Sequence, residues 1–253
     1  MTRDATRPLA GCAALVTGAS SGIGAATALA LAAEGAAVAL VARRADRLTD
    51  LAAHIAGKGG HAFVLPADLT DPDRARSAVE EAASQLGRLD VLVNNAGAVV
   101  PGAFEDGAAT DWERMLALNV SAVLHTSRAA LPHLLAAADG PRGVADLVTV
   151  ASAAGRVARP NNAVYTATKH AVVGFSEALR KEITQRRVRV GLVEPGMVTT
   201  EATTAPGIGL PSSVDPKDWL TAEDVARAIV FMVTQPRHAA VNEILLRPTT
   251  QVN

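Results

Sequence analysis

The chain has 253 residues, 49% of them apolar, and its 24 basic and 25 acidic residues leave a formal net charge of −1. This length suits one large domain or two small ones, and the apolar content is sufficient for a substantial core. The balanced charge and the lack of a basic run exclude an extended surface for nucleic acid or an anionic membrane. The single cysteine, Cys12, excludes an intramolecular disulfide and suits a reducing compartment.

The N-terminal segment loosely imitates a signal peptide, because Arg3 and Arg7 precede the apolar residues 9–16. That apolar run is short and leads directly into a glycine turn, so we interpret it as a strand that follows a loose tail of residues 1–10. No apolar run is long enough to cross a bilayer. We therefore expect a soluble, cytoplasmic protein.

Short apolar runs with β-branched residues are predicted strands. They cover residues 13–16, 37–42, 62–65, 91–93, 145–150, 188–193 and 243–246. Between them lie longer runs of alanine, leucine and glutamate with helical spacing. These cover residues 23–34, 44–57, 72–86, 111–137, 163–186 and 222–234. The alternation predicts an α/β fold, a parallel sheet with right-handed crossovers and helices on both faces, in a single domain of residues 11–253.

Some features depart from this regular alternation. Pro132 lies inside the predicted helix 111–137 and is expected to kink or end it. Residues 199–218 are rich in proline and glycine, which predicts a substrate lid at about residues 199–220. A cluster of arginines lies where the helix 163–186 would end, and cations there are favourable to the helix dipole. The cluster consists of Arg186, Arg187 and Arg189.

Residues 17–24 form a glycine-rich turn, T-G-A-S-S-G-I-G, between the first predicted strand and the first predicted helix. Glycines let the backbone approach a diphosphate, and the free N–H groups at a helix start attract its negative charge. The spacing G-x-x-x-G-x-G departs from the G-x-G-x-x-G dinucleotide fingerprint. A simple tight turn is the alternative, and the position between strand and helix favours phosphate binding.

Tyr165, the only tyrosine, and Lys169 are four residues apart in the predicted helix 163–186. This spacing puts both side chains on one helix face, about 5–6 Å apart at Cβ. A phenol normally titrates near ~10, and a nearby ammonium lowers that pKa toward the range useful for general acid–base catalysis. Ser152 would hold a carbonyl oxygen beside the phenol. The spacing alone is more typical of an ordinary tyrosine and lysine on an amphipathic helix.

Further motifs stand at fixed distances from these residues. Asn94-Asn95-Ala96-Gly97 follows the fourth predicted strand, Asn119 lies in the helix 111–137, and Pro195-Gly196 follows the sixth strand. With the glycine turn, Ser152, Tyr165 and Lys169, this order resembles the classical short-chain dehydrogenase/reductase family from about residue 11 to residue 247. The resemblance implies a doubly wound Rossmann-type fold and hydride transfer between a nicotinamide and a carbonyl or alcohol carbon. No metal is needed, and none of the six histidines has a second ligand at metal spacing.

The resemblance also implies the catalytic roles. Tyr165 would exchange a proton with the substrate oxygen, Ser152 would orient that oxygen, and Lys169 would lower the phenol pKa and hold the ribose. Asn119 would anchor a water that relays protons to Lys169. Its alternative role is to satisfy backbone groups at a helix irregularity.

The second predicted strand ends in Ala42-Arg43-Arg44, with alanine where the resemblance places an aspartate that selects NAD. Two guanidinium groups suit the additional phosphate, so the predicted cofactor is NADP(H). Solvated charges at the start of the next helix are the alternative. The cofactor-contacting positions implied are Gly18, Ser20, Ser21, Gly22, Ile23, Gly24, Arg43, Arg44, Asp68, Leu69, Asn94, Ala96, Gly97, Tyr165, Lys169, Pro195, Gly196, Val198 and Thr200. Thr199 is the alternative to Thr200, and a cap of the helix that begins at Pro72 is an equal alternative role for Asp68.

We therefore expect an NADP(H)-dependent reductase of a small aldehyde or ketone. The finer resemblance, carried by Glu194-Pro195-Gly196 and N-E-I-L-L-R-P-T at residues 242–249, is to clavulanic-acid-type and short-chain hydroxy-acid dehydrogenases. The alternatives are an epimerase or dehydratase that uses bound nicotinamide, and a non-catalytic NADP-binding redox sensor. Arg156 would meet an anionic substrate or stay solvated. The two longest helices resemble those that pair family subunits, so we expect a homotetramer, with a dimer as the alternative.

Overall fold

The structure is a computed structural model that describes residues 7–204 and 214–252. Its centre is a seven-stranded sheet in the order β3-β2-β1-β4-β5-β6-β7. Every neighbouring pair of strands is parallel. The strands are β1 (Ala13–Thr17), β2 (Ala37–Ala42), β3 (His61–Pro66), β4 (Val91–Asn94), β5 (Ala145–Val150), β6 (Val188–Pro195) and β7 (Glu243–Leu246). The predicted α/β sheet is confirmed.

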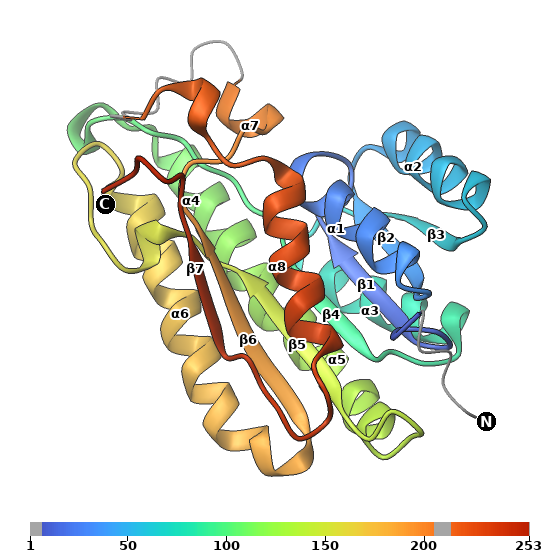
Figure 1. Ribbon diagram of the computed structural model, residues 1–253. Coiled ribbons are helices and arrows are strands. Elements are labelled where there is room, and N and C mark those ends of the chain that lie inside the picture. Colours follow the sequence, from blue (N-terminus) through green and yellow to red (C-terminus); the bar gives the residue numbers. More distant parts are fainter. Residues whose placement is uncertain (1–6, 205–213, 253) are drawn as a thin grey trace.

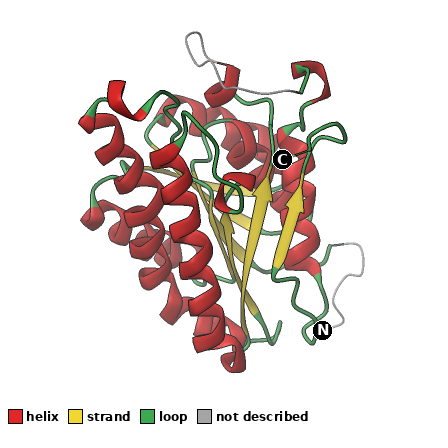
Figure 2. Cartoon of the chain, turned by 90° about the vertical axis from the view of Figure 1, so that its left-hand side faces the viewer, coloured by secondary structure: helices red, strands yellow, loops and turns green. Residues whose placement is uncertain are grey.

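Helices cover both faces of this sheet (Figures 1 and 2). One face packs against α1 (Gly22–Ala33), α2 (Ala45–Gly57) and α8 (Ala222–Thr234). The other packs against α3 (Pro72–Leu86), α5 (Ala122–Ala138) and α6 (Ala163–Ile183). Successive side chains of a strand point to opposite faces, so Ala14 and Val16 enter the first core and Leu15 the second. The strands are therefore apolar on both faces, as expected for a buried parallel sheet.

Shorter elements connect these layers. They are α4 (Ala109–Leu116), α7 (Glu201–Thr204), a π turn (Ala117–Ser121) and four 3-10 turns, Phe104–Asp106, Ala153–Gly155, Thr184–Arg186 and Pro216–Asp218. The predicted lid thus contains α7 and a 3-10 turn, and its residues 205–213 lie outside the described part of the chain. No helix among the described residues is long and apolar enough to cross a membrane.

The strand order reverses between β1 and β4. The chain runs outward from β1 to β3, then returns to pair β4 with the other side of β1. The loops after these two strands diverge at their carboxyl ends, and such a point is where doubly wound sheets bind ligands. The residues that follow β5 and β6 reach the same edge, and α7 lies above it in Figure 1.

The helix predicted at residues 111–137 is interrupted, but not at Pro132. α5 continues through Pro132 to Ala138, so the expected end at the proline is wrong. The interruption is the π turn of Ala117–Ser121, which separates α4 from α5 and contains Asn119. Single π turns within helices are frequent at functional sites.

Some expectations at element ends need correction. Asp71, not Asp68, caps α3, because its Oδ1 accepts hydrogen bonds from the N–H groups of Asp73 and Arg74 at 2.8 and 3.4 Å. Arg189 does not end a helix: it is buried in β6 and binds both carboxylate oxygens of Asp146 at 2.7 and 3.0 Å. The predicted loose tail is already packed at Leu9, which is fully buried.

Candidate active site

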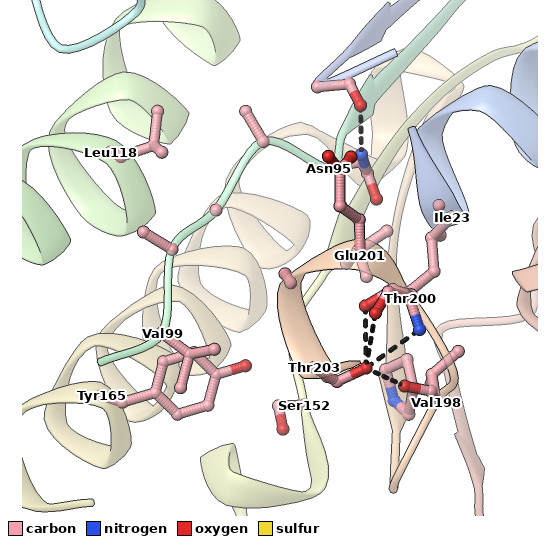
Figure 3. Close-up of a pocket in the computed structure, with 18 of the residues that line it drawn as sticks. Ile23, Asn95, Val99, Leu118, Ser152, Tyr165, Val198, Thr200, Glu201 and Thr203 are labelled. Carbon is pink, nitrogen blue, oxygen red and sulfur yellow. Dashed lines mark hydrogen bonds between the residues drawn. The ribbon is translucent and has the colours of Figure 1, made fainter. Parts of the chain in front are cut away.

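A pocket of about 560 Å³ opens at the carboxyl edge of the sheet, where the strand order reverses (Figure 3). Most of the residues predicted to bind a cofactor or to act in catalysis line it. They are Gly18, Ser20, Ser21, Gly22, Ile23, Arg43, Arg44, Leu69, Ala96, Gly97, Ser152, Tyr165, Lys169, Pro195, Gly196, Val198 and Thr200. The predicted residues outside this lining are Gly24, Asp68, Asn94 and Asn119.

The glycine turn needs its glycines for close packing. Gly18 and Gly22 have φ angles of +67° and +52°, in the left-handed region that disfavours other residues. A Cβ on Gly24 would lie 2.3 Å from the carbonyl oxygen of Gly18, so Gly24 lets the turn fold back on α1. Ser21, at the N-cap of α1, makes no capping hydrogen bond with its side chain, and the first turn has no acidic residue. The start of α1 is therefore suited to an anion.

Thr17 and Asn95 tie the two diverging loops together. The hydroxyl of Thr17 accepts hydrogen bonds from the backbone N–H groups of Asn95 (2.9 Å) and Ala96 (3.0 Å). In return, the Asn95 side-chain amide donates to the Thr17 carbonyl at 2.9 Å. Asn95 lines the pocket next to the glycine turn, and Figure 3 shows its amide. The sequence motif contained this residue, but its spacing did not distinguish it from Asn94.

Asn94 points away from the pocket. Its side-chain amide donates to Ser127 Oγ at 2.9 Å, and Thr126 Oγ1 donates to its carbonyl oxygen at 2.7 Å. Both partners belong to α5, and all three residues are buried. The Asn94 side chain therefore joins β4 to α5, and the lining of the pocket begins at the next residue.

Arg44 lies against the glycine turn. Its Nη2 atom donates to Ser21 Oγ at 2.8 Å and to Ser20 Oγ at 3.1 Å. Its Nη1 atom donates to both carboxylate oxygens of Glu201, at 2.8 and 2.9 Å. Arg43 also lines the pocket and is exposed. This end of the pocket thus combines guanidinium groups, serine hydroxyls and a helix start, a set that suits a phosphate.

The Asp68 carboxylate is hydrogen-bonded to Thr70 and does not line the pocket. Its Oδ1 atom accepts hydrogen bonds from the backbone N–H (3.0 Å) and the hydroxyl (2.8 Å) of Thr70. The backbone bond from Thr70 holds the pKa of this carboxyl below its usual value. Leu69, the next residue, contributes to the lining instead.

Tyr165, Ser152 and Lys169 meet at the other end of the pocket. The Lys169 Nζ atom lies 5.6 Å from the centroid of the Tyr165 ring and donates to the Val150 carbonyl at 2.9 Å. Burial lowers the pKa of Lys169 to about 8. Burial also raises the pKa of Tyr165, and its hydrogen bond with Ser152 acts in the opposite direction. The structure therefore differs from the expected lowering of the phenol pKa, because desolvation outweighs the polar contact.

Asn119 does not line the pocket but connects two segments near Lys169 through its side-chain amide. Its Oδ1 atom accepts from the Ala98 N–H at 2.7 Å, while its Nδ2 atom donates to the Ala98 carbonyl (2.8 Å) and to Thr168 Oγ1 (3.1 Å). The side chain is buried and joins the loop after β4 to α6, one residue before Lys169. These contacts match the alternative role, in which asparagine satisfies backbone groups at a helix irregularity.

The segment after β6 is held by residues that sequence reasoning missed. Thr203 Oγ1 donates to the Val198 carbonyl at 2.7 Å and accepts from the Thr200 N–H at 2.9 Å (Figure 3). Gln251 Oε1 accepts from the Met197 N–H at 2.9 Å. Thr200 lines the pocket, and Thr199, which was the alternative, does not. Residue 251 comes 54 positions after Met197, so no local pattern indicates this contact.

Two arginines near the reaction end have different environments. Arg156 is held by carboxylates: its Nε atom donates to Glu194 at 2.7 Å, and its Nη2 atom lies 2.6 Å from Glu243. Glu194 is 1% exposed, so Arg156 neutralises a buried charge and is not available to a substrate. Arg159, three residues later, lines the pocket.

Comparison with known proteins identifies the family. A model of the short chain dehydrogenase family matches residues 12–207. An uncharacterized oxidoreductase of Staphylococcus aureus strain N315 is 35% identical over 235 residues, which cover 93% of this chain and 96% of that protein. A glycine betaine reductase of Emericella nidulans is 38% identical over 245 residues, which cover 95% of this chain but 19% of that longer protein.

Solved structures give the same result. A short chain dehydrogenase from Burkholderia cenocepacia J2315, crystallised with NADP, is 31% identical and has a TM-score of 0.83, covering 95% of this chain and 98% of that one. A metagenomic short-chain oxidoreductase, also in complex with NADP, is 32% identical with a TM-score of 0.81 and covers 96% and 99%. The chain therefore belongs to the short chain dehydrogenase family of oxidoreductases.

Proposed function

We propose that this protein is an NADP(H)-dependent oxidoreductase that reduces an aldehyde or ketone of a small molecule. One observation carries the proposal: a phosphate-binding end and a Ser152, Tyr165, Lys169 cluster line one continuous pocket. A cofactor that spans the pocket would place its nicotinamide beside the phenol. The two related structures that contain NADP support the choice of cofactor.

The residues present fit the proposed cofactor. Gly18, Gly22 and the start of α1 would hold the diphosphate, and Arg43 and Arg44 would hold the adenosine phosphate. Ala42 is buried and offers no carboxylate that would bind the ribose hydroxyls of NAD. At the far end, Val198 and Thr200 are the proposed contacts of the nicotinamide carboxamide. When bound, NADPH supplies the hydride for the reduction.

The raised pKa of Tyr165 favours the reductive direction. A phenol that keeps its proton at neutral pH is a proton donor, and the hydroxyls of Tyr165 and Ser152 can both donate to the substrate oxygen. With a pKa of about 8, Lys169 is mostly a cation at pH 7, and its charge stabilises the phenolate left after proton transfer. Asn119 is proposed to position this region and to anchor the water that returns a proton through Lys169.

A carbonyl panel tests the proposal. The protein and NADPH are mixed with aldehydes, ketones and oxo acids while the absorbance of the reduced nicotinamide is followed. We expect consumption of NADPH with at least one carbonyl, and loss of that activity in Tyr165→Phe with retained NADPH binding. An epimerase or dehydratase would convert its substrate without net consumption of NADPH. A redox sensor would bind NADPH and turn over nothing, and either result would reject the proposal.

We also propose a homotetramer in the cytoplasm, with a dimer as the alternative. Leu116 on α4 and Leu124 on α5 are 50% and 39% exposed, which supports the pairing of these helices between subunits. Light scattering after size-exclusion chromatography would measure the mass, and a monomer would contradict this assembly. The single cysteine supports the location, which expression of a tagged chain would test.

A further inference from the structure

The Glu201 carboxylate is paired with the Arg44 guanidinium, the group that is expected to bind the adenosine phosphate of the cofactor. The three nitrogens of the Arg44 guanidinium are all engaged, by the Ser20 and Ser21 hydroxyls and by the Glu201 carboxylate. Glu201 belongs to α7, which follows β6, whereas Arg44 follows β2. β1, β4 and β5 lie between those two strands, so this ion pair spans the pocket. Figure 3 shows Glu201 on the side where Ile23 and Asn95 lie.

The contacts made by Glu201 are those that a phosphate monoester would make. A carboxylate and a phosphate both bind arginine through two oxygens, and both accept hydrogen bonds from serine hydroxyls. The hydrogen bonds from Arg44 lower the pKa of Glu201, so its carboxylate is charged at neutral pH. Two anions on one guanidinium repel each other, and NAD(H) brings no phosphate to this position.

We propose that Glu201 competes with the adenosine phosphate of NADP(H) for Arg44. This inference rests on the proposed cofactor site. Binding of NADP(H) separates Glu201 from Arg44, whereas NAD(H) leaves the ion pair in place. Glu201 therefore weakens the binding of the phosphorylated cofactor and leaves the binding of the unphosphorylated one unchanged.

Binding measurements on Glu201→Gln test this competition. Titration of protein fluorescence with NADPH and with NADH gives both dissociation constants without any need for catalysis. We expect Glu201→Gln to bind NADPH on the order of fivefold more tightly at low salt and NADH with unchanged affinity. Glu182→Gln, an equal change of charge at an exposed position on α6, is the matched control and should change neither constant. In an Arg44→Ala background the effect of Glu201→Gln should disappear.

The outcomes separate this inference from the proposed function. A wild-type protein that does not bind NADPH rejects the cofactor site itself. Wild-type binding with no gain in Glu201→Gln, or an equal change for NADPH and NADH, rejects the competition alone. Weaker NADPH binding in Glu201→Gln would also reject the competition, because it would show that the ion pair helps to hold the cofactor.

Arg159 is a second charged group of interest in the pocket. Arg159 lines the pocket, between the 3-10 turn that follows Ser152 and the start of α6, which carries Tyr165. Within the described part of the chain it has no carboxylate partner, in contrast to Arg156. Of the lining residues that the structure describes, Glu201 is the only acidic one, and it is paired with Arg44.

An unpaired guanidinium in the pocket that also holds the proton donor favours a substrate of opposite charge. The nearby N-terminus of α6 has no acidic residue in its first turn, which adds positive potential. We infer that the substrate carries a carboxylate, which Arg159 binds while the carbonyl oxygen lies between Ser152 and Tyr165. This inference also rests on the proposed function.

Matched aldehydes test the charge of the substrate. Isothermal titration of the NADP⁺ complex with 4-carboxybenzaldehyde and with benzaldehyde compares two ligands that differ by one carboxylate, in a state that cannot turn over. We expect the carboxylated aldehyde to bind at least about tenfold more tightly, as for a charge-assisted contact. Arg159→Met should remove the difference and Arg159→Lys should keep part of it.

Equal binding of the two aldehydes, or binding of neither, would reject the carboxylate site. The same holds if Arg159→Met weakens both aldehydes equally, because that pattern indicates a general loss of pocket structure. Failure of the NADP⁺ complex to form is detected first and concerns the proposed function instead.

Discussion

The phosphate end of the pocket is built mainly from backbone, whereas the reaction end is built from side chains. Between β1 and β4, the glycine turn is fixed by the φ angles of Gly18 and Gly22 and by the close approach of Gly24 to Gly18. At the reaction end, Ser152, Tyr165 and Lys169 come from two different elements and depend on the packing of α6. A backbone site tolerates almost no added atom, while a side-chain site is sensitive to charge and desolvation. The two ends should therefore respond differently to substitution.

The largest effect is expected at the reaction end, from Lys169→Met. The variant keeps the length of the side chain and removes the cation beside Tyr165. We expect kcat to fall by roughly 10²–10⁴-fold, the range for loss of a group that tunes acid–base catalysis. Steady-state kinetics with a substrate from the carbonyl panel provide the measurement. A fall of less than tenfold would show that Lys169 does not act on the phenol.

The pH dependence of stability should change in the same variant. Lys169 has a folded pKa of about 8 against an ordinary value of 10.5, so the unfolded chain binds more protons between these values. Stability from this group therefore rises with pH above 8, and Lys169→Met lacks the rise. From pH 7 to pH 9.5 we expect the wild type to gain about 2 kcal/mol relative to the variant, at about 1.36 kcal/mol per pKa unit.

Urea unfolding of both proteins at several pH values measures this difference. The raised pKa of Tyr165 would have the opposite sign, but it acts only above the ordinary phenol value near ~10. The range to pH 9.5 therefore isolates Lys169. A constant difference between the two proteins across this range would contradict the burial of a titrating ammonium.

The contrast between the two ends also explains what the sequence could predict. The glycine turn, the alternation of strands and helices and the Tyr165–Lys169 spacing depend on local backbone geometry or on a period, and the sequence displays both. The sequence did not show which of two neighbouring polar residues faces the pocket. Asn95 lines the pocket while Asn94 binds α5, because the end of β4 directs successive side chains to opposite faces.

Long-range partners account for the other differences. Arg156 was predicted to meet an anionic substrate or to stay solvated, but Glu194 and Glu243 from two later strands hold it. The pKa of Tyr165 depends on how completely α6 and its neighbours exclude water from the phenol. The spacing of residues along the sequence does not indicate that degree of burial. The break in the helix at Asn119 instead of Pro132 likewise follows from tertiary contacts with Ala98 and Thr168.

At the phosphate end, Gly24→Ala should destabilise the fold and weaken cofactor binding. The new Cβ would meet the Gly18 carbonyl oxygen at 2.3 Å, so the turn must open. We expect a loss of about 1–3 kcal/mol in the free energy of unfolding, as for overpacking, and a marked loss of NADPH affinity. Gly174→Ala in α6 is the control, because nothing lies within 4 Å of its Cβ position. That variant should be stabilised by up to ~1 kcal/mol, and equal effects at both positions would argue against the close packing of the turn.

The smallest effect is expected from Thr17→Val, which removes the acceptor between the two diverging loops. The N–H groups of Asn95 and Ala96 both lose their partner, while the volume of the side chain hardly changes. Because these hydrogen bonds are only partly buried, their loss should cost about 1 kcal/mol, and the midpoint of urea unfolding should fall with an unchanged slope. Because Asn95 keeps its contact with the Thr17 carbonyl, NADPH binding should weaken only a few fold. If Thr17→Val leaves stability unchanged but abolishes NADPH binding, the hydroxyl contacts the cofactor directly and the tie between the loops is not its main role.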